Sequence, residues 1–253
     1  MLKTRVIPSL LIRNGGLIKT VRFKNARYVG DPINAIKVFN DKEVDELAVI
    51  DIDASRDNRG PDFKMLGRIN KEAFMPLAYG GGVSTLEQVR KVLGLGYEKI
   101  IINSHAIQNR SFITEAANIC GSQSVVVCID VKKTVFGGYH VYDHLKKKVH
   151  KIVALDYACE VEKRGAGELL IYSVDRDGTF GGYDIALLKV ITSGVSIPVV
   201  ALGGAGNIKD FSAAVGEAGV SAVSAGSFFV FHGPHRAVLI TYPDRNELEN
   251  VLA

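Results

Sequence analysis

Two glycine clusters stand where a phosphate group could bind. Gly80-Gly81-Gly82 and Gly203-Gly204 each follow a short apolar run and precede a helical pattern. Glycine has no side chain, so the backbone N–H groups of such a turn can approach an anion, and the positive end of the next helix dipole attracts it. The following apolar runs end in Asn103-Ser104 and Gly226-Ser227, which add hydroxyl groups and further amides. Together the two clusters predict a ligand with a phosphate at each end.

Five aspartates close or follow apolar runs and are candidates for acid–base chemistry. Asp130 ends one of these runs and is the best candidate for a general acid or base. Asp177 precedes Gly178 in a tight loop after another run. The other three are expected to fix loops by accepting hydrogen bonds from backbone N–H groups; they are Asp51, Asp53 and Asp175.

Four charged residues lie at the opposite ends of the apolar runs. They are Arg5, Glu46, Lys99 and Glu168. Two acids and two bases around one face could form a closed ring of ion pairs. From the residues alone, stabilisation of that face is favoured over a role in function.

Eight short apolar runs must position these side chains. They cover residues 5–12, 47–51, 76–79, 99–102, 124–130, 168–172, 197–202 and 220–225. Helical patterns lie between them, at 84–96, 110–120, 153–165 and 184–194. The runs are almost continuously apolar, which is typical of parallel strands buried on both faces. The pattern predicts an α/β fold, a closed (β/α)8 TIM barrel in one domain over residues 1–253. An open doubly wound sheet is the alternative, but nothing divides the chain into two nucleotide-binding halves.

One half of the chain resembles the other. Residues 76–104 align with 198–226, with proline on proline and the two glycine clusters superimposed. Residues 46–55 align with the segment that starts at Glu168 in the same register. This internal similarity predicts a barrel with two-fold pseudo-symmetry and matched loops on opposite sides of its mouth.

Composition limits the classes of function. The 253 residues carry a net charge of +4 and include three cysteines. Their odd number predicts free thiols in a reducing compartment, and their spacing matches no metal motif. The first apolar stretch is too short for a signal peptide, and no run approaches the roughly 20 residues that span a bilayer. We therefore expect a cytoplasmic protein that has no cofactor and does not bind membranes. Binding of nucleic acid is not expected either, because aromatic residues are not interleaved with basic ones. The basic segment 132–151 is either a solvated loop or a flap that attracts a phosphorylated substrate.

Several of these motifs resemble the HisF family, the cyclase subunit of imidazole glycerol phosphate synthase. The resemblance covers nearly the whole chain. The matching segments are "GDP", "DELAVIDIDAS", "YGGGVST", "INSHAI", "GSQSVVVCIDVK", "EVEKRGAGELL", "VDRDGTFGGYD" and "GGAG".

The resemblance implies a function and its residues. A HisF barrel docks a glutaminase subunit, HisH, on the amino-terminal face of its strands, and ammonia passes through the barrel to a bis-phosphorylated formimino ribulosyl nucleotide. The four charged residues above then fall on gate positions at the ammonia entrance, and Asp130 is a catalytic residue. The implied substrate-binding residues are Lys19, Gly82, Asn103, Ser104, Asp177, Gly178, Gly204, Gly226 and Ser227.

The sequence also departs from the family pattern. The family uses aspartates at the ends of strands one and five, but strand one carries Leu11. Ala78, Leu202 and Tyr172 differ near the mouth, and 144–152 lacks the expected glycine and threonine. These departures resemble HisF-like paralogues associated with surface-polysaccharide synthesis, which work with a HisH-like glutaminase and a sugar amidotransferase. Two functions therefore stay open: an ammonia-dependent cyclase, or an ammonia conduit with weakened chemistry.

Overall fold

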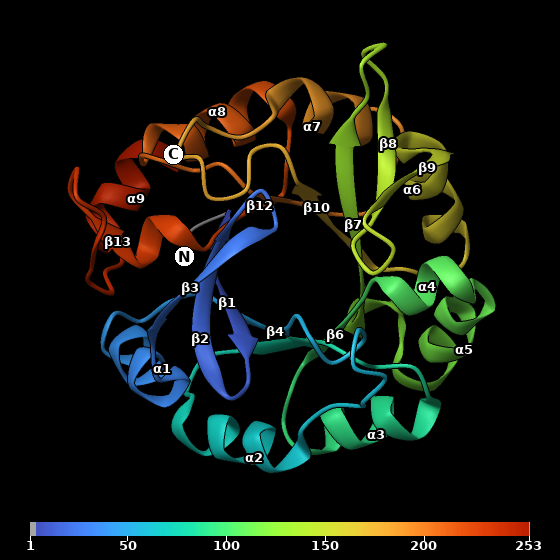
Figure 1. The fold of residues 1–253 in the computed structure, drawn as a ribbon, viewed down its shortest axis with the longest axis horizontal. Coiled ribbons are helices and arrows are strands. Elements are labelled where there is room, and N and C mark those ends of the chain that lie inside the picture. Colours follow the sequence, from blue (N-terminus) through green and yellow to red (C-terminus); the bar gives the residue numbers. More distant parts are fainter. Residues whose placement is uncertain (1–3, 253) are drawn as a thin grey trace.

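The computed structural model describes residues 4–252, which form a closed barrel of eight parallel strands (Figure 1). Each strand pairs with the next, and β12 pairs with β1 to complete the cylinder. The barrel strands are β1 (Arg5–Arg13), β4 (Leu47–Asp51), β5 (Leu77–Gly80), β6 (Lys99–Ile102), β7 (Val125–Lys133), β10 (Glu168–Ser173), β11 (Val199–Leu202) and β12 (Ala222–Ala225). The predicted (β/α)8 barrel is confirmed.

Helices surround the strands as an outer ring (Figure 1). They are α1 (Pro32–Asp41), α2 (Phe63–Glu72), α3 (Leu86–Gly94), α4 (Ser104–Gln108), α5 (Ser111–Cys120), α6 (Ala154–Lys163), α7 (Ile185–Thr192), α8 (Lys209–Ala218) and α9 (Arg245–Leu252). Their starts follow from local chemistry: Asp31 caps α1, and Thr85 forms a capping box with Gln88 at α3. None of the helices in residues 4–252 is both long and apolar enough to cross a membrane.

Two hydrophobic cores hold the barrel together. The larger one lies between the strands and the helices, and it includes Phe39, Tyr79 and Phe211. The smaller one fills the lumen with inward-facing side chains, among them Ile7, Ala48 and Leu170. Because alternate residues of each strand face these two cores, the strands read as continuous apolar runs.

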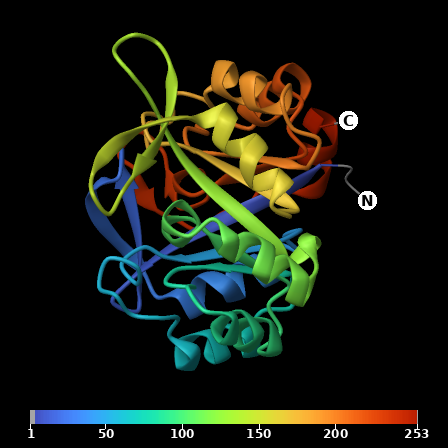
Figure 2. The ribbon, with the colours of Figure 1, turned by 90° about the vertical axis from the view of Figure 1, so that its right-hand side faces the viewer.

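Two β-hairpins extend from the carboxyl ends of the barrel strands, and the sequence did not predict them. The first is β2 (Gly16–Val21) with β3 (Lys24–Gly30), which follows β1. The second is β8 (Tyr139–Asp143) with β9 (Lys148–Val153), which pairs with the extended end of β7. Figure 2 shows the turn that joins β7 to β8 projecting beyond the barrel. The loop or flap expected at 132–151 is therefore a hairpin.

Short elements complete the chain. Two 3-10 turns cover Ser122–Ser124 and Ser227–Phe229. A small antiparallel pair, β13 (Phe231–His232) with β14 (Ala237–Val238), precedes the last helix. The predicted strand at 197–202 begins only at Val199, since Pro198 has no N–H group and its carbonyl instead accepts a bond from Leu169.

Strand register gives the internal symmetry a structural form. Ile50 of β4 pairs with Leu11, and Tyr172 of β10 pairs with Asp130. The repeat alignment superimposes Ile50 on Tyr172, so Leu11 and Asp130 occupy matched positions half a turn apart. Each of the two matched strands, β1 and β7, is also followed by a hairpin. The two strands therefore provide the same backbone position, and they differ there only in the side chain.

Candidate active site at the carboxyl ends of the strands

The later glycine cluster forms one wall of a small cavity. Lys19, Asp177 and Ser227 line it, as do Gly178, Gly204 and Gly226. At Gly204 the backbone φ is +112°, and a Cβ atom would lie 2.2 Å from the carbonyl oxygen of Gly182. Only glycine fits there. Among the described residues, the N–H groups of Gly204 and Ala205 donate to no other protein atom, which leaves them available to an anion.

Lys19 brings a positive charge to this cavity. The structure places it in strand β2, where its side chain is buried. Its ammonium group donates to the carbonyl oxygen of Ser9 at 2.6 Å and lies against Gly226. Burial lowers the pKa of Lys19 to about 8, although the charge of Asp177 opposes the shift. A bound phosphate would favour the charged form of this lysine.

Asp177 ties the first hairpin to the barrel. One of its carboxylate oxygens accepts from Thr20 Oγ1 at 2.7 Å and from the backbone N–H of Phe23 at 3.0 Å. The other accepts from the hydroxyl of Tyr172 at 2.7 Å. The ring of Phe23 packs edge-on against Tyr172, with 4.7 Å between centroids. The hairpin is thereby held inward over the mouth, and Asp177 serves as a tether as well as part of the cavity wall.

The earlier glycine cluster repeats the same geometry on the opposite side. A Cβ atom at Gly81 would lie 2.6 Å from the carbonyl oxygen of Asp51, and one at Gly203 would lie 2.9 Å from that of Ser173. At Gly82 the backbone φ is +68°, and its N–H group donates to Ser55 Oγ at 3.3 Å. The two clusters are therefore matched in backbone shape, although the earlier one already uses one of its amides.

Asn103 and Ser104 lie beside this earlier cluster, at the end of β6. The side-chain oxygen of Asn103 is buried and has no hydrogen-bond partner within the described chain. Ser104 is buried too, and its hydroxyl lies 3.3 Å from Nε2 of His144. Both side chains thus have polar atoms near the mouth that a ligand could engage.

Asp130 lies deep in the mouth and is only 2% exposed. Its Oδ2 atom accepts a hydrogen bond from His144 Nδ1 at 3.0 Å, and its Oδ1 atom lies 3.7 Å from the sulfur of Cys128. Leu11, at the matched position of β1, lines the cavity of the later cluster and is also buried. The carboxylate that strand one lacks is therefore replaced by an apolar wall.

His144 is a functional candidate that sequence reasoning missed. It lies in the turn between β8 and β9, which Asp143 fixes by accepting from the backbone N–H groups of Leu145 and Lys146 at 2.9 and 3.0 Å. Burial lowers the pKa of His144, but the hydrogen bond and charge of Asp130 outweigh this, and the pKa lies above its ordinary value. The sequence shows His144 only as one histidine in a basic segment. Its contact with Asp130 could not be predicted, because the pairing of the hairpin strands creates that contact.

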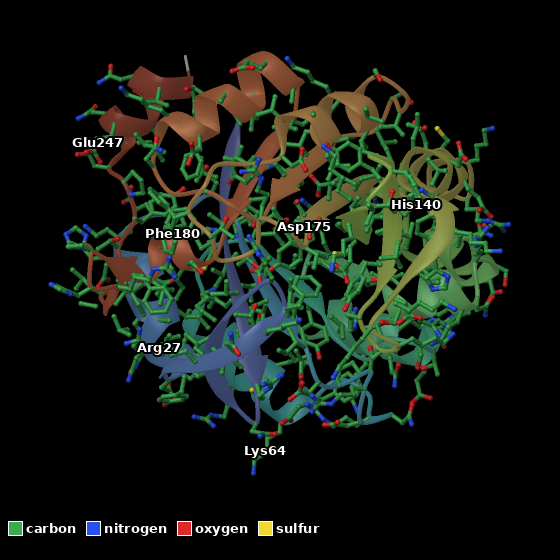
Figure 3. The ribbon with its side chains drawn as sticks, turned by 45° about the horizontal axis from the view of Figure 1, so that its top comes forward. Arg27, Lys64, His140, Asp175, Phe180 and Glu247 are labelled. Carbon is green, nitrogen blue, oxygen red and sulfur yellow. The ribbon has the colours of Figure 1, made fainter. Side chains whose placement is uncertain are left out.

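Two of the three aspartates that were expected to fix loops accept hydrogen bonds from backbone N–H groups. Asp51 accepts from the backbone N–H groups of Asp53 and Ala54, and Asp175 accepts from that of Lys133 at 3.0 Å, as predicted. Figure 3 shows Asp175 in the loop region after β10. The prediction for Asp53 is wrong: its carboxylate forms ion pairs with two arginines, Arg13 and Arg56.

The four charged residues at the opposite end of the barrel form a closed ring. Arg5 pairs with both Glu46 and Glu168. Lys99 pairs with the same two glutamates, at 2.9 Å in each case. Both glutamate side chains are almost completely buried, so the ring closes the floor of the lumen.

Across residues 4–252, the structure contains no group of three or more histidine, cysteine, aspartate or glutamate side chains that could hold a metal ion. The polar groups of the mouth instead suit an anionic organic ligand, since they combine free amides, a buried ammonium group and one carboxylate–imidazole pair.

Comparison with known proteins gives the chain its relatives. The family described as "Histidine biosynthesis protein" matches residues 5–235. A Pseudomonas aeruginosa protein, provisionally named as imidazole glycerol phosphate synthase subunit hisF2, is 50% identical over 98% of this chain and 99% of its own length. A similarly named Leptospira interrogans protein is 48% identical over 98% of both chains. The imidazole glycerol phosphate synthase subunit HisF of Hyphomonas neptunium is 43% identical over 91% of both chains. The chain therefore belongs to the histidine biosynthesis protein family, as a HisF-like member.

Proposed function

We propose that this chain is the barrel subunit of an ammonia-dependent synthase. It would convert a bis-phosphorylated formimino ribulosyl nucleotide into imidazole glycerol phosphate and an aminoimidazole carboxamide ribotide (AICAR). The observation that carries the proposal is the pair of matched glycine clusters on opposite sides of one mouth. A substrate with a phosphate at each end would bind one phosphate in each cluster and hold its middle near Asp130.

The ammonia source in this proposal is a HisH-like glutaminase bound at the amino-terminal face of the strands. The closed ring of Arg5, Glu46, Lys99 and Glu168 supports this, because it seals the lumen at the face where such a partner would dock. The lumen above the ring is lined by small and apolar side chains such as Ala48, which do not hydrogen-bond to a small neutral molecule. The ring would then act as the gate that admits ammonia.

A second candidate is a HisF-like paralogue with impaired cyclase chemistry, which relays ammonia to a sugar amidotransferase in surface-polysaccharide synthesis. Leu11 favours this candidate. Loss of one of two general acid–base groups costs about 10²- to 10⁴-fold in rate, and Leu11 occupies the position matched to Asp130. The phosphate-binding geometry would then be retained for a different ligand, or for regulation.

One assay separates the two candidates. The purified protein is incubated with ammonium salt and the formimino ribulosyl substrate, and AICAR release is measured. The proposed synthase should show turnover that falls by at least about 100-fold in Asp130→Asn. Absence of turnover in the wild type, with a gain in Leu11→Asp, would instead identify a conduit that lost only its acid. If neither the wild type nor Leu11→Asp showed turnover, but the complex stimulated the activity of the glutaminase partner, the chain would be identified as a relay protein.

A further inference from the structure

We propose that His144, oriented by Asp130, is the group that exchanges protons with the substrate at this mouth. The inference rests on the proposed function and assigns its chemistry to a residue outside the matched strand-end positions. Position 11 contributes only a leucine, so a second proton-transfer group must come from elsewhere.

Asp130 is too enclosed to meet a substrate directly. It is 2% exposed, one of its oxygens is taken by His144, and the other faces the sulfur of Cys128. The side chain of His144 is 27% exposed. The imidazole therefore stands between the carboxylate and the open mouth, in the arrangement of a buried acid that orients a histidine base.

The outer nitrogen of His144 points to a substrate-binding position. Nε2 lies 3.3 Å from the hydroxyl of Ser104, which is next to Asn103 and the earlier glycine cluster. The turn that carries His144 is held by Asp143, which also contacts His150 at 3.4 Å. The imidazole is thus fixed at both nitrogens and by its backbone, which is the preorganisation that a proton-transfer group requires.

Four of the other titratable groups around the mouth are poorly suited to this task. Burial raises the pKa of Tyr172 and of Cys128 well above their ordinary values, so neither exchanges a proton near neutral pH. Burial also raises the pKa of Tyr142, on β8. Asp177 already accepts three hydrogen bonds. The groups that face His144 are Asp130 on β7, Asp143 beside it and the neutral hydroxyl of Ser104.

The proton transfers balance without an oxidant or a metal. The nitrogen lone pair of ammonia attacks the ketose carbonyl carbon, and the carbonyl π electrons move to oxygen, which takes a proton from Nε2 of the imidazolium. The new C–N nitrogen then loses a proton to the same Nε2. Next the C–O bond breaks with its electron pair on oxygen, which accepts the proton back and leaves as water. The nitrogen forms the C=N bond and loses its proton to Nε2, so ammonia and ketone become imine and water. Asp130 stays ionised and stabilises the imidazolium throughout.

The test compares His144→Gln and His144→Ala with the wild type, using ammonium salt and the formimino ribulosyl substrate. We expect kcat to fall by about 100-fold or more with KM changed by less than about threefold, and added imidazole to restore activity to His144→Ala. His140→Gln is the matched control on the same hairpin, because His140 makes no hydrogen bond to Asp130; it should keep its activity within about twofold.

Each outcome decides a separate point. An active wild type with an equally active His144→Gln would overturn the inference and leave the proposed function intact. An inactive wild type would overturn both. In a second measurement, which needs no substrate, NMR titration of His144 should give a lower pKa in Asp130→Asn than in the wild type. An unchanged pKa would show that Asp130 does not govern this imidazole.

Discussion

Replacing Lys19 by methionine should make the protein's stability respond differently to pH. The ammonium group of Lys19 is buried, and its pKa is lowered from 10.5 to about 8. A lysine whose folded pKa is lowered destabilises the fold while it is charged, that is, below the folded pKa. The full displacement corresponds to about 3 kcal/mol, and this cost disappears as pH rises through the folded and then the unfolded pKa.

The measurement is urea unfolding of the wild type and Lys19→Met at pH of about 7 and about 9.5. Methionine keeps the length of the side chain but has no titratable group. From the two pKa values, the stability of the wild type relative to the variant should rise by about 2 kcal/mol between these pH values. The contact of Lys19 with Ser9 is lost in the variant at both pH values, so it largely cancels in this difference.

Phosphate extends the same test to function. Inorganic phosphate in the cavity would favour the charged lysine, so it should stabilise the wild type at pH of about 7 and stabilise Lys19→Met much less. A difference between the two proteins that stays constant from neutral to alkaline pH would refute the reasoning, because it would mean that Lys19 titrates as an exposed lysine does.

Three further predictions concern other parts of the molecule. Gly204→Ala should weaken binding of the bis-phosphate substrate by at least about tenfold in calorimetry, because the new Cβ meets a carbonyl oxygen, whereas Gly216→Ala, in open space on α8, should bind normally. Lys99→Met should lower the free energy of unfolding by about 2 kcal/mol. This loss is smaller than the full cost of an unpaired buried charge, because Arg5 still contacts both glutamates of the ring. Asp130→Asn should remove a pH-dependent part of stability: since the folded pKa of His144 is raised, the pair stabilises most at pH below about 6.5 and less as pH rises through the folded pKa. Urea unfolding of both proteins at acidic and alkaline pH measures that loss. If the free energy of unfolding changed equally with pH in the two proteins, the prediction would be contradicted.

Most of the barrel could be predicted because its strands are buried on both faces. The runs at 47–51 and 99–102 match β4 and β6 to the residue. The ring of four charges could also be predicted, since residues at the starts of parallel strands must converge at one end of a closed barrel. These features depend only on burial and on chain order.

The second hairpin could not be predicted, for a different reason, although the turn that leads from β1 into the first one does carry an Asn-Gly pair, Asn14-Gly15. The strand Tyr139–Asp143 mixes buried and half-buried residues, and half of the residues in its neighbour Lys148–Val153 are polar. Their four-residue turn contains neither glycine nor an Asn-Gly pair, which are the usual hairpin signals. Extension of β7 beyond the barrel creates the pairing edge, and that extension is a tertiary feature.

The site shows the same division. The glycine clusters were visible because a turn without side chains leaves a mark in sequence. The Asp130–His144 contact was not, because it joins a barrel strand to a hairpin turn across space. Burial of Lys19 was equally hidden, since its strand carries it inward over the mouth.

The most direct test of the account is a crystal structure with the bis-phosphorylated substrate bound under conditions that prevent turnover. One phosphate should lie against Gly204 and Lys19, the other against Gly82 and Ser104, and the ribulosyl carbons should lie within reach of His144. A substrate with both phosphates on one side of the mouth, or bound away from both glycine clusters, would contradict it.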